Sequence, residues 1–139
     1  MKLPTKDRYA VMAIVDLALH STCGKPVTLQ AISARQNISL TYLERIFISL
    51  RRNGIVASVK GPGGGYVLSK DPGAVSISEV LRAMDSRSFK MTRCSRGVCV
   101  SGVEKCLTHK IWASLGASMN AHLSAISIND VINNSTGVL

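Results

Sequence analysis

The sequence predicts a mainly α-helical chain with one small β-hairpin, and three observations support this fold class. Apolar residues recur at helical spacing in several segments, a glycine-rich run separates two β-branched segments, and serine or threonine precedes several predicted helices. A length of 139 residues suits one compact domain with an appended helix. We divide the chain into a first domain over 1–84, a loop over 85–106 and a C-terminal helical part over 107–139.

The first part of the chain is predicted to contain three helices. A buried helix covers residues 7–19, and a short second helix covers 29–36. The third helix begins near Ser39 or Thr41, either of which can cap it, and ends at about Asn53. Its inward stripe recurs at intervals of three and four residues: Leu43, Ile46, Phe47 and Leu50. Two helices joined by a short turn, the second basic on its outer side, indicate a helix-turn-helix.

Two strand-like runs follow the third helix. They cover 55–59 and 66–68 and are separated by a glycine-rich tip at 60–65. In the order helix, turn, helix, hairpin, this hairpin is the wing of a winged helix-turn-helix. Ser76 and Glu79 then form a predicted capping box that opens a fourth helix.

The C-terminal part begins with a long predicted helix over 107–126. Its apolar residues lie in one stripe, and a chain of this size offers few partners to cover it. We therefore expect this helix to pair with its copy in a second subunit, which makes the protein a homodimer. Ser127 is expected to cap a short last helix.

Positive charge is concentrated in the first half of the chain. Residues 1–70 carry ten Lys and Arg against three acidic residues, whereas residues 71–139 carry seven against five. A positive field attracts phosphate, which predicts double-stranded promoter DNA as a partner, with an anionic membrane surface as the alternative. No segment approaches the roughly 18 apolar residues of a membrane-spanning helix, and no signal peptide is recognised. We expect a cytoplasmic protein.

Candidate DNA-binding residues lie on the third helix and the wing. Hydroxyl groups at the start of the helix can contact phosphates or base edges. Glu44 can accept a hydrogen bond from cytosine N4, and its alternative is a capping box with Thr41. Glycines at the wing tip allow Lys60 and the backbone to approach DNA closely. The set is Ser39, Thr41, Tyr42, Glu44, Arg51, Lys60, Gly63 and Gly64.

Three cysteines and a histidine form a candidate metal site. They are spaced Cys-x4-Cys-x6-Cys-x2-His, at Cys94, Cys99, Cys106 and His109. Thiols in a reducing compartment more often bind metals than form disulfides. Cys106 and His109 are three apart at a predicted helix start, so both can face one metal. Zinc and an iron-sulfur cluster both suit these ligands, and the spacing leaves the two open.

Other functional classes have less support. The sequence contains no paired carboxylates in a cleft-like arrangement and no nucleophile beside a base, so no enzyme is predicted. An electron-transfer protein and a zinc-stabilised interaction module are the remaining alternatives to a DNA-binding regulator.

Four segments in the same order resemble the IscR family of winged-helix iron-sulfur regulators. The resemblance spans nearly the whole chain, and its segments are Lys6 with Arg8–Val11, Ile38–Glu44, Gly61–Tyr66 and Cys106–His109. It adds Lys6, Arg8 and Gly61 to the predicted DNA-binding set. Three positions depart from the family pattern: Cys99 is shifted by one residue, Lys60 replaces an arginine, and Asp7 replaces a small residue near the N-terminus.

The resemblance implies a homodimeric transcription regulator of iron-sulfur cluster assembly genes. It implies a [2Fe-2S] cluster on Cys94, Cys99, Cys106 and His109, with zinc as the alternative, and cluster-assembly scaffold proteins as possible donors. In that family the cluster-bound form is a repressor of assembly genes, and the cluster-free form binds a second class of DNA site. The residue matching Glu44 separates the two classes. A sister sensor of nitric oxide or redox state with the same fold is the nearest alternative.

Overall fold

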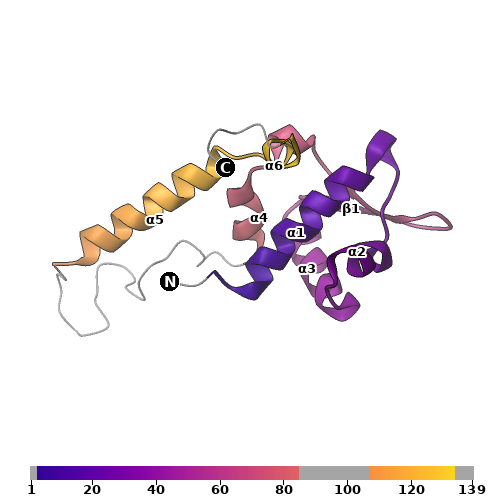
Figure 1. Cartoon of the computed structure of the whole chain (residues 1–139), viewed down its shortest axis with the longest axis horizontal. Coiled ribbons are helices and arrows are strands. Elements are labelled where there is room, and N and C mark those ends of the chain that lie inside the picture. Colours follow the sequence, from indigo (N-terminus) through magenta and orange to yellow (C-terminus); the bar gives the residue numbers. More distant parts are fainter. Residues whose placement is uncertain (1–2, 85–106, 134–139) are drawn as a thin grey trace.

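The computed structural model describes residues 3–84 and 107–133. Within these ranges the fold is helical with a two-stranded hairpin, as predicted (Figure 1). The elements in chain order are α1 (Thr5–His20), η1 (Thr22–Gly24), α2 (Leu29–Gln36), α3 (Leu40–Arg52), β1 (Val56–Val59), β2 (Gly65–Leu68), η2 (Pro72–Ala74), α4 (Ile77–Met84), α5 (His109–Ser124) and α6 (Ile128–Asn133).

The helix-turn-helix is formed by α2 and α3, and local capping defines both of its helices. The Thr28 hydroxyl accepts a hydrogen bond from the Ala31 amide at 3.2 Å at the start of α2. Asn37 adopts a left-handed conformation, with φ 53°, and ends that helix. The Ser39 hydroxyl accepts from the Tyr42 amide at 3.2 Å. Of the two predicted caps of α3, Ser39 and Thr41, it is therefore Ser39 that caps the helix.

The wing is an antiparallel hairpin that is also tied to the segment before α2. Val56 lies opposite Leu68, and Val59 lies opposite Gly65. Tyr66 exchanges two backbone hydrogen bonds with Val27, at 2.9 and 2.8 Å, a bridge that the sequence did not predict. A Cβ atom on Gly65 would lie 2.5 Å from the Val27 carbonyl oxygen. Only glycine fits where these backbones cross.

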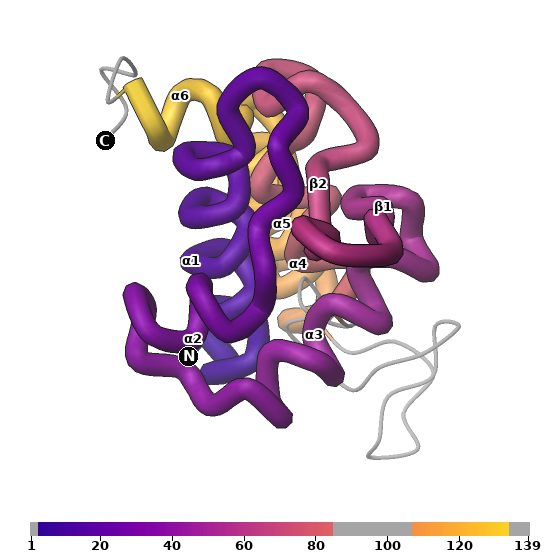
Figure 2. The backbone as a smooth tube through the Cα atoms, turned by 90° about the vertical axis from the view of Figure 1, so that its right-hand side faces the viewer, coloured from indigo at the N-terminus to yellow at the C-terminus, as the bar shows by residue number. Residues whose placement is uncertain are grey.

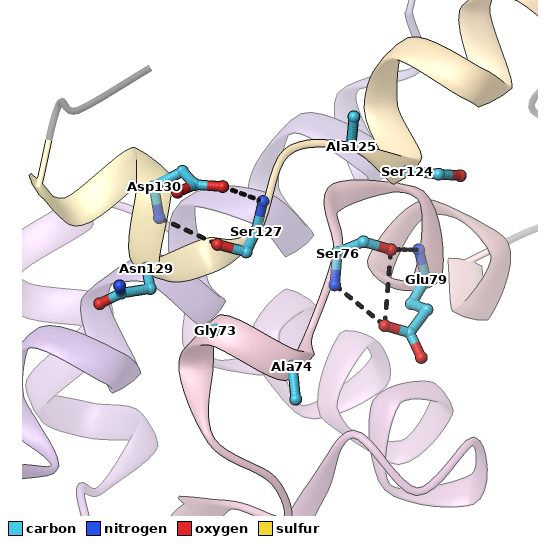
Figure 3. A pocket seen from close by; sticks show the side chains of 9 residues that line it. All are labelled: Gly73, Ala74, Ser76, Glu79, Ser124, Ala125, Ser127, Asn129 and Asp130. Atoms are coloured by element: carbon cyan, nitrogen blue, oxygen red, sulfur yellow. Dashed lines mark hydrogen bonds between the residues drawn. The ribbon is translucent and has the colours of Figure 1, made fainter.

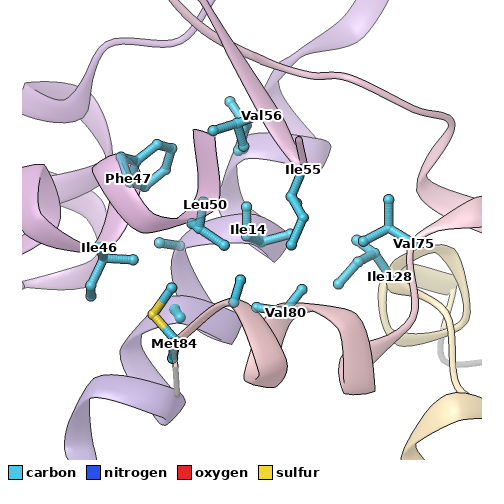
Figure 4. Close-up of a cluster of buried hydrophobic side chains, with 14 of the residues drawn as sticks. Ile14, Ile46, Phe47, Leu50, Ile55, Val56, Val75, Val80, Met84 and Ile128 are labelled. Carbon is cyan, nitrogen blue, oxygen red and sulfur yellow. The ribbon is translucent and has the colours of Figure 1, made fainter. Parts of the chain in front are cut away.

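One hydrophobic core lies between α1, α3, α4 and the base of the wing (Figure 4). Phe47 and Leu50 of α3 and Ile14 of α1 are completely buried in it. The predicted inward stripe of α3 is confirmed, because all four of its residues belong to this core. The Phe47 ring also contacts Tyr66 edge to face, with 4.9 Å between ring centroids. The core thereby joins α3 to β2.

A buried ion pair joins α1 to α2. The Asp16 side chain is only 1% exposed, and both of its oxygens accept hydrogen bonds from the Arg35 guanidinium, the shortest at 2.6 Å. Gln36 donates to the same carboxylate at 2.8 Å. Burial alone would raise the pKa of Asp16, but these hydrogen bonds outweigh it and lower the pKa below its ordinary value. The pair therefore stabilises the fold above pH 3.8, and the stabilisation is lost as the pH falls through the lowered folded-state pKa.

The starts of α4 and α6 lie side by side and are built alike (Figure 3). In each, a serine and an acidic residue form a capping box: Ser76 with Glu79, as predicted, and Ser127 with Asp130. Hydrogen bonds from the backbone amides of Ser76 and Ser127 lower the pKa of Glu79 and Asp130, respectively. An isolated bridge between the two serines connects the two segments.

Helix α5 extends away from the domain, on the side opposite the wing (Figure 1). Its later turns are anchored to α4, because Asn120 Oδ1 accepts from Ser78 at 2.7 Å and from Arg82 at 2.9 Å. Its first turns expose apolar side chains: Ile111 is 61% exposed and Trp112 is 41% exposed. Among the described residues, therefore, only the later part of the predicted stripe is packed against other elements.

We expect Arg35→Met to lower the free energy of unfolding by about 2 kcal/mol near neutral pH, because it leaves the Asp16 carboxylate in a buried site without its main partner. The value lies below that of a fully buried pair, since the Arg35 side chain is itself 35% exposed. The measurement is chemical denaturation as a function of pH.

Arg45→Met is the matched control, because Arg45 is exposed and its replacement should change stability by no more than about 0.5 kcal/mol. The difference between Arg35→Met and wild type should shrink as the pH falls below about 4 and Asp16 becomes protonated. A difference that does not depend on pH would show that the ion pair is not its source.

Candidate nucleic-acid interface

Helix α3 has an outward face directly opposite its core stripe. This face is exposed, and among the described residues no other element packs over it. It combines a hydroxyl, a carboxylate, two guanidinium groups and one apolar side chain. Its residues are Thr41, Glu44, Arg45, Ile48 and Arg52. Because positions three, four and seven apart on a helix share a side, these groups can meet one ligand together.

The start of α3 holds three predicted DNA-binding residues in different situations. The Ser39 hydroxyl is used as the helix cap, and Thr41 is exposed beside it. Tyr42 is half-buried, and its ring contacts Tyr9 of α1 edge to face, with 5.6 Å between centroids. Tyr42 thus helps to hold the start of α3 against α1.

The Glu44 carboxylate is exposed and has no hydrogen bond or ion pair to any residue in the described part of the chain. A capping box between Glu44 and Thr41 is wrong, because the cap is Ser39. The described residues therefore give this carboxylate no structural role.

The wing follows α3 in the chain, and its strand β1 lies next to that helix (Figure 2). The tip of the wing carries one lysine and several glycines. Lys60 is exposed. Gly63 has φ 73°, and a Cβ atom on Gly64 would lie 2.3 Å from the Val59 carbonyl oxygen. Gly61 accepts a hydrogen bond from the Gly64 amide at 2.9 Å and has φ 96°. The turn itself thus requires these glycines, whatever the wing contacts.

Arg51 and the N-terminal residues complete the predicted set. The Arg51 guanidinium lies 3.5 Å from the Ser58 hydroxyl of β1, and Arg8 is exposed. The Lys6 ammonium donates a hydrogen bond to the carbonyl of Met84, the last residue of α4, at 3.0 Å. A cation at a helix C-terminus is stabilising, so Lys6 has an internal role that sequence analysis missed.

Most of the predicted metal site lies outside the described residues, namely Cys94, Cys99 and Cys106. His109 is described: it is half-buried and is the first residue of α5. Helix α5 begins two residues later than predicted. Cys106 lies outside the described residues, so a shared helix face for Cys106 and His109 stays a prediction. Cys23 is exposed in η1.

The chemistry of His109 suits a metal ligand. Within the described ranges its imidazole forms no hydrogen bond or ion pair, so both ring nitrogens are available there. Residues 3–84 and 107–133 by themselves contain no group of three or more histidine, cysteine or acidic residues that could hold a metal ion. None of the helices in these ranges has the length and apolar character to cross a bilayer.

Comparison with known proteins identifies the family. Residues 3–134 match the model of the Rrf2 family, described as an iron-dependent transcriptional regulator. The chain is 50% identical over 135 residues to the HTH-type transcriptional regulator IscR of Cronobacter sakazakii, covering 96% of this chain and 82% of that protein. The IscR of Klebsiella pneumoniae is 49% identical, with 96% and 81% covered.

Solved structures agree with this assignment. T. potens IscR superposes with a TM-score of 0.79 at 29% identity, covering 98% of this chain and 89% of that chain. CymR of B. subtilis, the global cysteine regulator, has a TM-score of 0.78 at 24% identity, with 98% and 99% covered, which supports the fold alone. The solved structures confirm the winged helix-turn-helix fold. The family match and the IscR relatives confirm the prediction of a DNA-binding regulator rather than an enzyme. The chain belongs to the Rrf2 family of iron-dependent transcriptional regulators.

Proposed function

We propose that the protein is a homodimeric repressor of iron-sulfur cluster assembly genes that senses cluster status through a bound [2Fe-2S] cluster. The observation that carries this proposal is 50% identity to an IscR regulator over 96% of the chain. The Cys94, Cys99, Cys106 and His109 ligand set supports it independently.

Promoter DNA would be bound by the outward face of α3 and by the wing. Arg45, Arg51 and Arg52 on α3 and Lys60 on the wing are exposed cations. The N-terminal turns of the second helix of a helix-turn-helix commonly enter the major groove, where base edges are distinguishable. The wing would then lie over the neighbouring backbone.

The dimer would be formed through the first turns of α5. Ile111 and Trp112 are exposed in the first turn of α5, and Leu107, which precedes the helix, is 96% exposed. A second copy buries this surface and supplies a second α3, as two half-sites on DNA require.

The cluster would be held by the three cysteines and His109. When bound, it supplies a redox-active iron-sulfur centre whose occupancy follows the cluster supply of the cell. One imidazole among thiolates suits an iron-sulfur cluster, and structural zinc is the less favoured occupant. Scaffold proteins of cluster assembly would be the donors, and the cytoplasm would be the site of action.

We expect Lys60→Met to weaken binding to all DNA sequences alike, because an ammonium group at the wing contacts phosphate rather than bases. The slope of the logarithm of the binding constant against the logarithm of salt concentration should become shallower by about 0.9 for each wing. For a dimer with two wings the change should be about twice that. The measurement is a titration of fluorescent duplex at several salt concentrations.

Lys70→Met is its matched control, because Lys70 lies beyond the other end of β2 and 3.4 Å from Glu79. Equal changes in salt dependence for the two variants would show only a general effect of net charge. A loss of selectivity in Lys60→Met would also contradict a phosphate contact.

We expect Glu44→Ala to alter which DNA sites are preferred more than it alters total affinity. A carboxylate facing DNA is favourable only where it accepts from cytosine N4, so its removal should change relative affinities about tenfold. The measurement is competition between duplexes that differ at single cytosines. Comparable losses on every duplex would contradict this role.

We expect Cys106→Ala to abolish cluster binding while leaving measurable DNA affinity. The measurement is anaerobic purification, followed by visible spectroscopy and analysis of iron, sulfide and zinc. Cys23→Ala is the control, because Cys23 is exposed in η1 and should leave iron and sulfide unchanged.

Two results would overturn the cluster proposal. One is an unchanged visible spectrum in Cys106→Ala, and the other is zinc without sulfide in the wild-type protein. Cys99→Ala, analysed in the same way, tests the ligand at the position that departs from the family spacing.

A further inference from the structure

Ile48 is an apolar side chain exposed at the centre of a charged face. It is 57% exposed on α3, and none of the described elements covers it. Ile48 follows Glu44 by four residues and Arg45 by three, so the three side chains share one side of the helix. Arg52 lies one turn further along the same side.

Exposed apolar residues are common, and a single one needs no explanation by itself. Ile48 differs in its surroundings. Its neighbours on the helix surface are two guanidinium groups and a carboxylate that has no partner in the described chain. A protein partner that covered Ile48 would also have to pair or desolvate these charges.

The major groove of DNA is complementary to this combination of charged and apolar side chains. In the major groove, phosphates flank the base edges, cytosine presents an amino donor, and thymine presents an apolar methyl group. Arginines suit the phosphates, Glu44 suits the cytosine, and a branched aliphatic side chain suits the methyl group. The charged side chains and the apolar side chain at the centre of this face can therefore all be matched by DNA.

We propose that Ile48 contacts the 5-methyl group of a thymine in the major groove and is a specificity-determining residue of this regulator. The inference rests on the proposed function, in which the outward face of α3 meets DNA. It adds a direct contact with a thymine, beside the contact of Glu44 with cytosine.

Uracil substitution tests the contact, because deoxyuridine lacks only the methyl group of thymidine. Wild-type protein first selects duplexes from a randomised library. Each thymine of a selected duplex is then replaced singly by uracil, and affinities are measured for wild type, Ile48→Ser and the control Ile48→Val. All three proteins should melt alike, because position 48 is exposed.

For wild type, a single uracil at the contacted thymine of one half-site should weaken binding about fourfold, which corresponds to one methyl group removed from an apolar contact. Ile48→Ser should bind the thymine and uracil forms of that duplex equally. Ile48→Val, which keeps a branched apolar side chain, should retain the preference.

Three outcomes would overturn the inference. If uracil weakens wild type and Ile48→Ser equally at every position, no methyl group contacts Ile48, although DNA binding stands. If Ile48→Ser changes the oligomeric state, the residue belongs to a protein contact. If selection yields no preferred duplex and binding is absent at low salt, the proposed function fails together with the inference.

Discussion

The buried carboxylate of Asp16 is the constraint on which the arrangement of the helix-turn-helix depends. A carboxylate that is 1% exposed is tolerated only with partners, and Arg35 and Gln36 of α2 supply them. Because both partners lie in the last turn of α2, the pair fixes that helix against α1. The turn at Asn37 then leads directly into α3, so the pair also fixes the point from which α3 starts.

Burial of one side of α3 decides which residues its other side exposes. Leu43, Phe47 and Leu50 are held in the core, and this fixes the rotation of α3 about its axis. The opposite side must then present Glu44 and Ile48 to solvent. The contact of Phe47 with Tyr66 and the bridge from Tyr66 to Val27 attach the wing to the same core. The helix and the wing therefore form one surface, as a shared DNA site requires.

The C-terminal part is connected to this surface through α4. Capping boxes align the starts of α4 and α6, and Asn120 binds α5 to Ser78 and Arg82. At its other end, α4 is joined to α1 by the bond from Lys6 to the Met84 carbonyl. Met84 directly precedes the segment that carries three of the proposed ligands. Sequence analysis placed Lys6 only in the DNA-binding set, whereas the structure shows that it also links α1 to α4.

Local features were determined by the sequence alone, because they depend on neighbouring residues. The caps at Thr28 and Ser39, the apolar stripe of α3 and the glycine-rich wing are of this kind. The sequence also predicted the outward place of Glu44. Contacts across long separations were decided only by tertiary structure: Lys6 lies 78 residues from Met84, and Asp16 lies 19 from Arg35. Such pairs leave no periodic signal, since burial and not spacing selects them. Helical spacing places Ile48 on the same side as Glu44, but only the assembled core shows that no described element covers it.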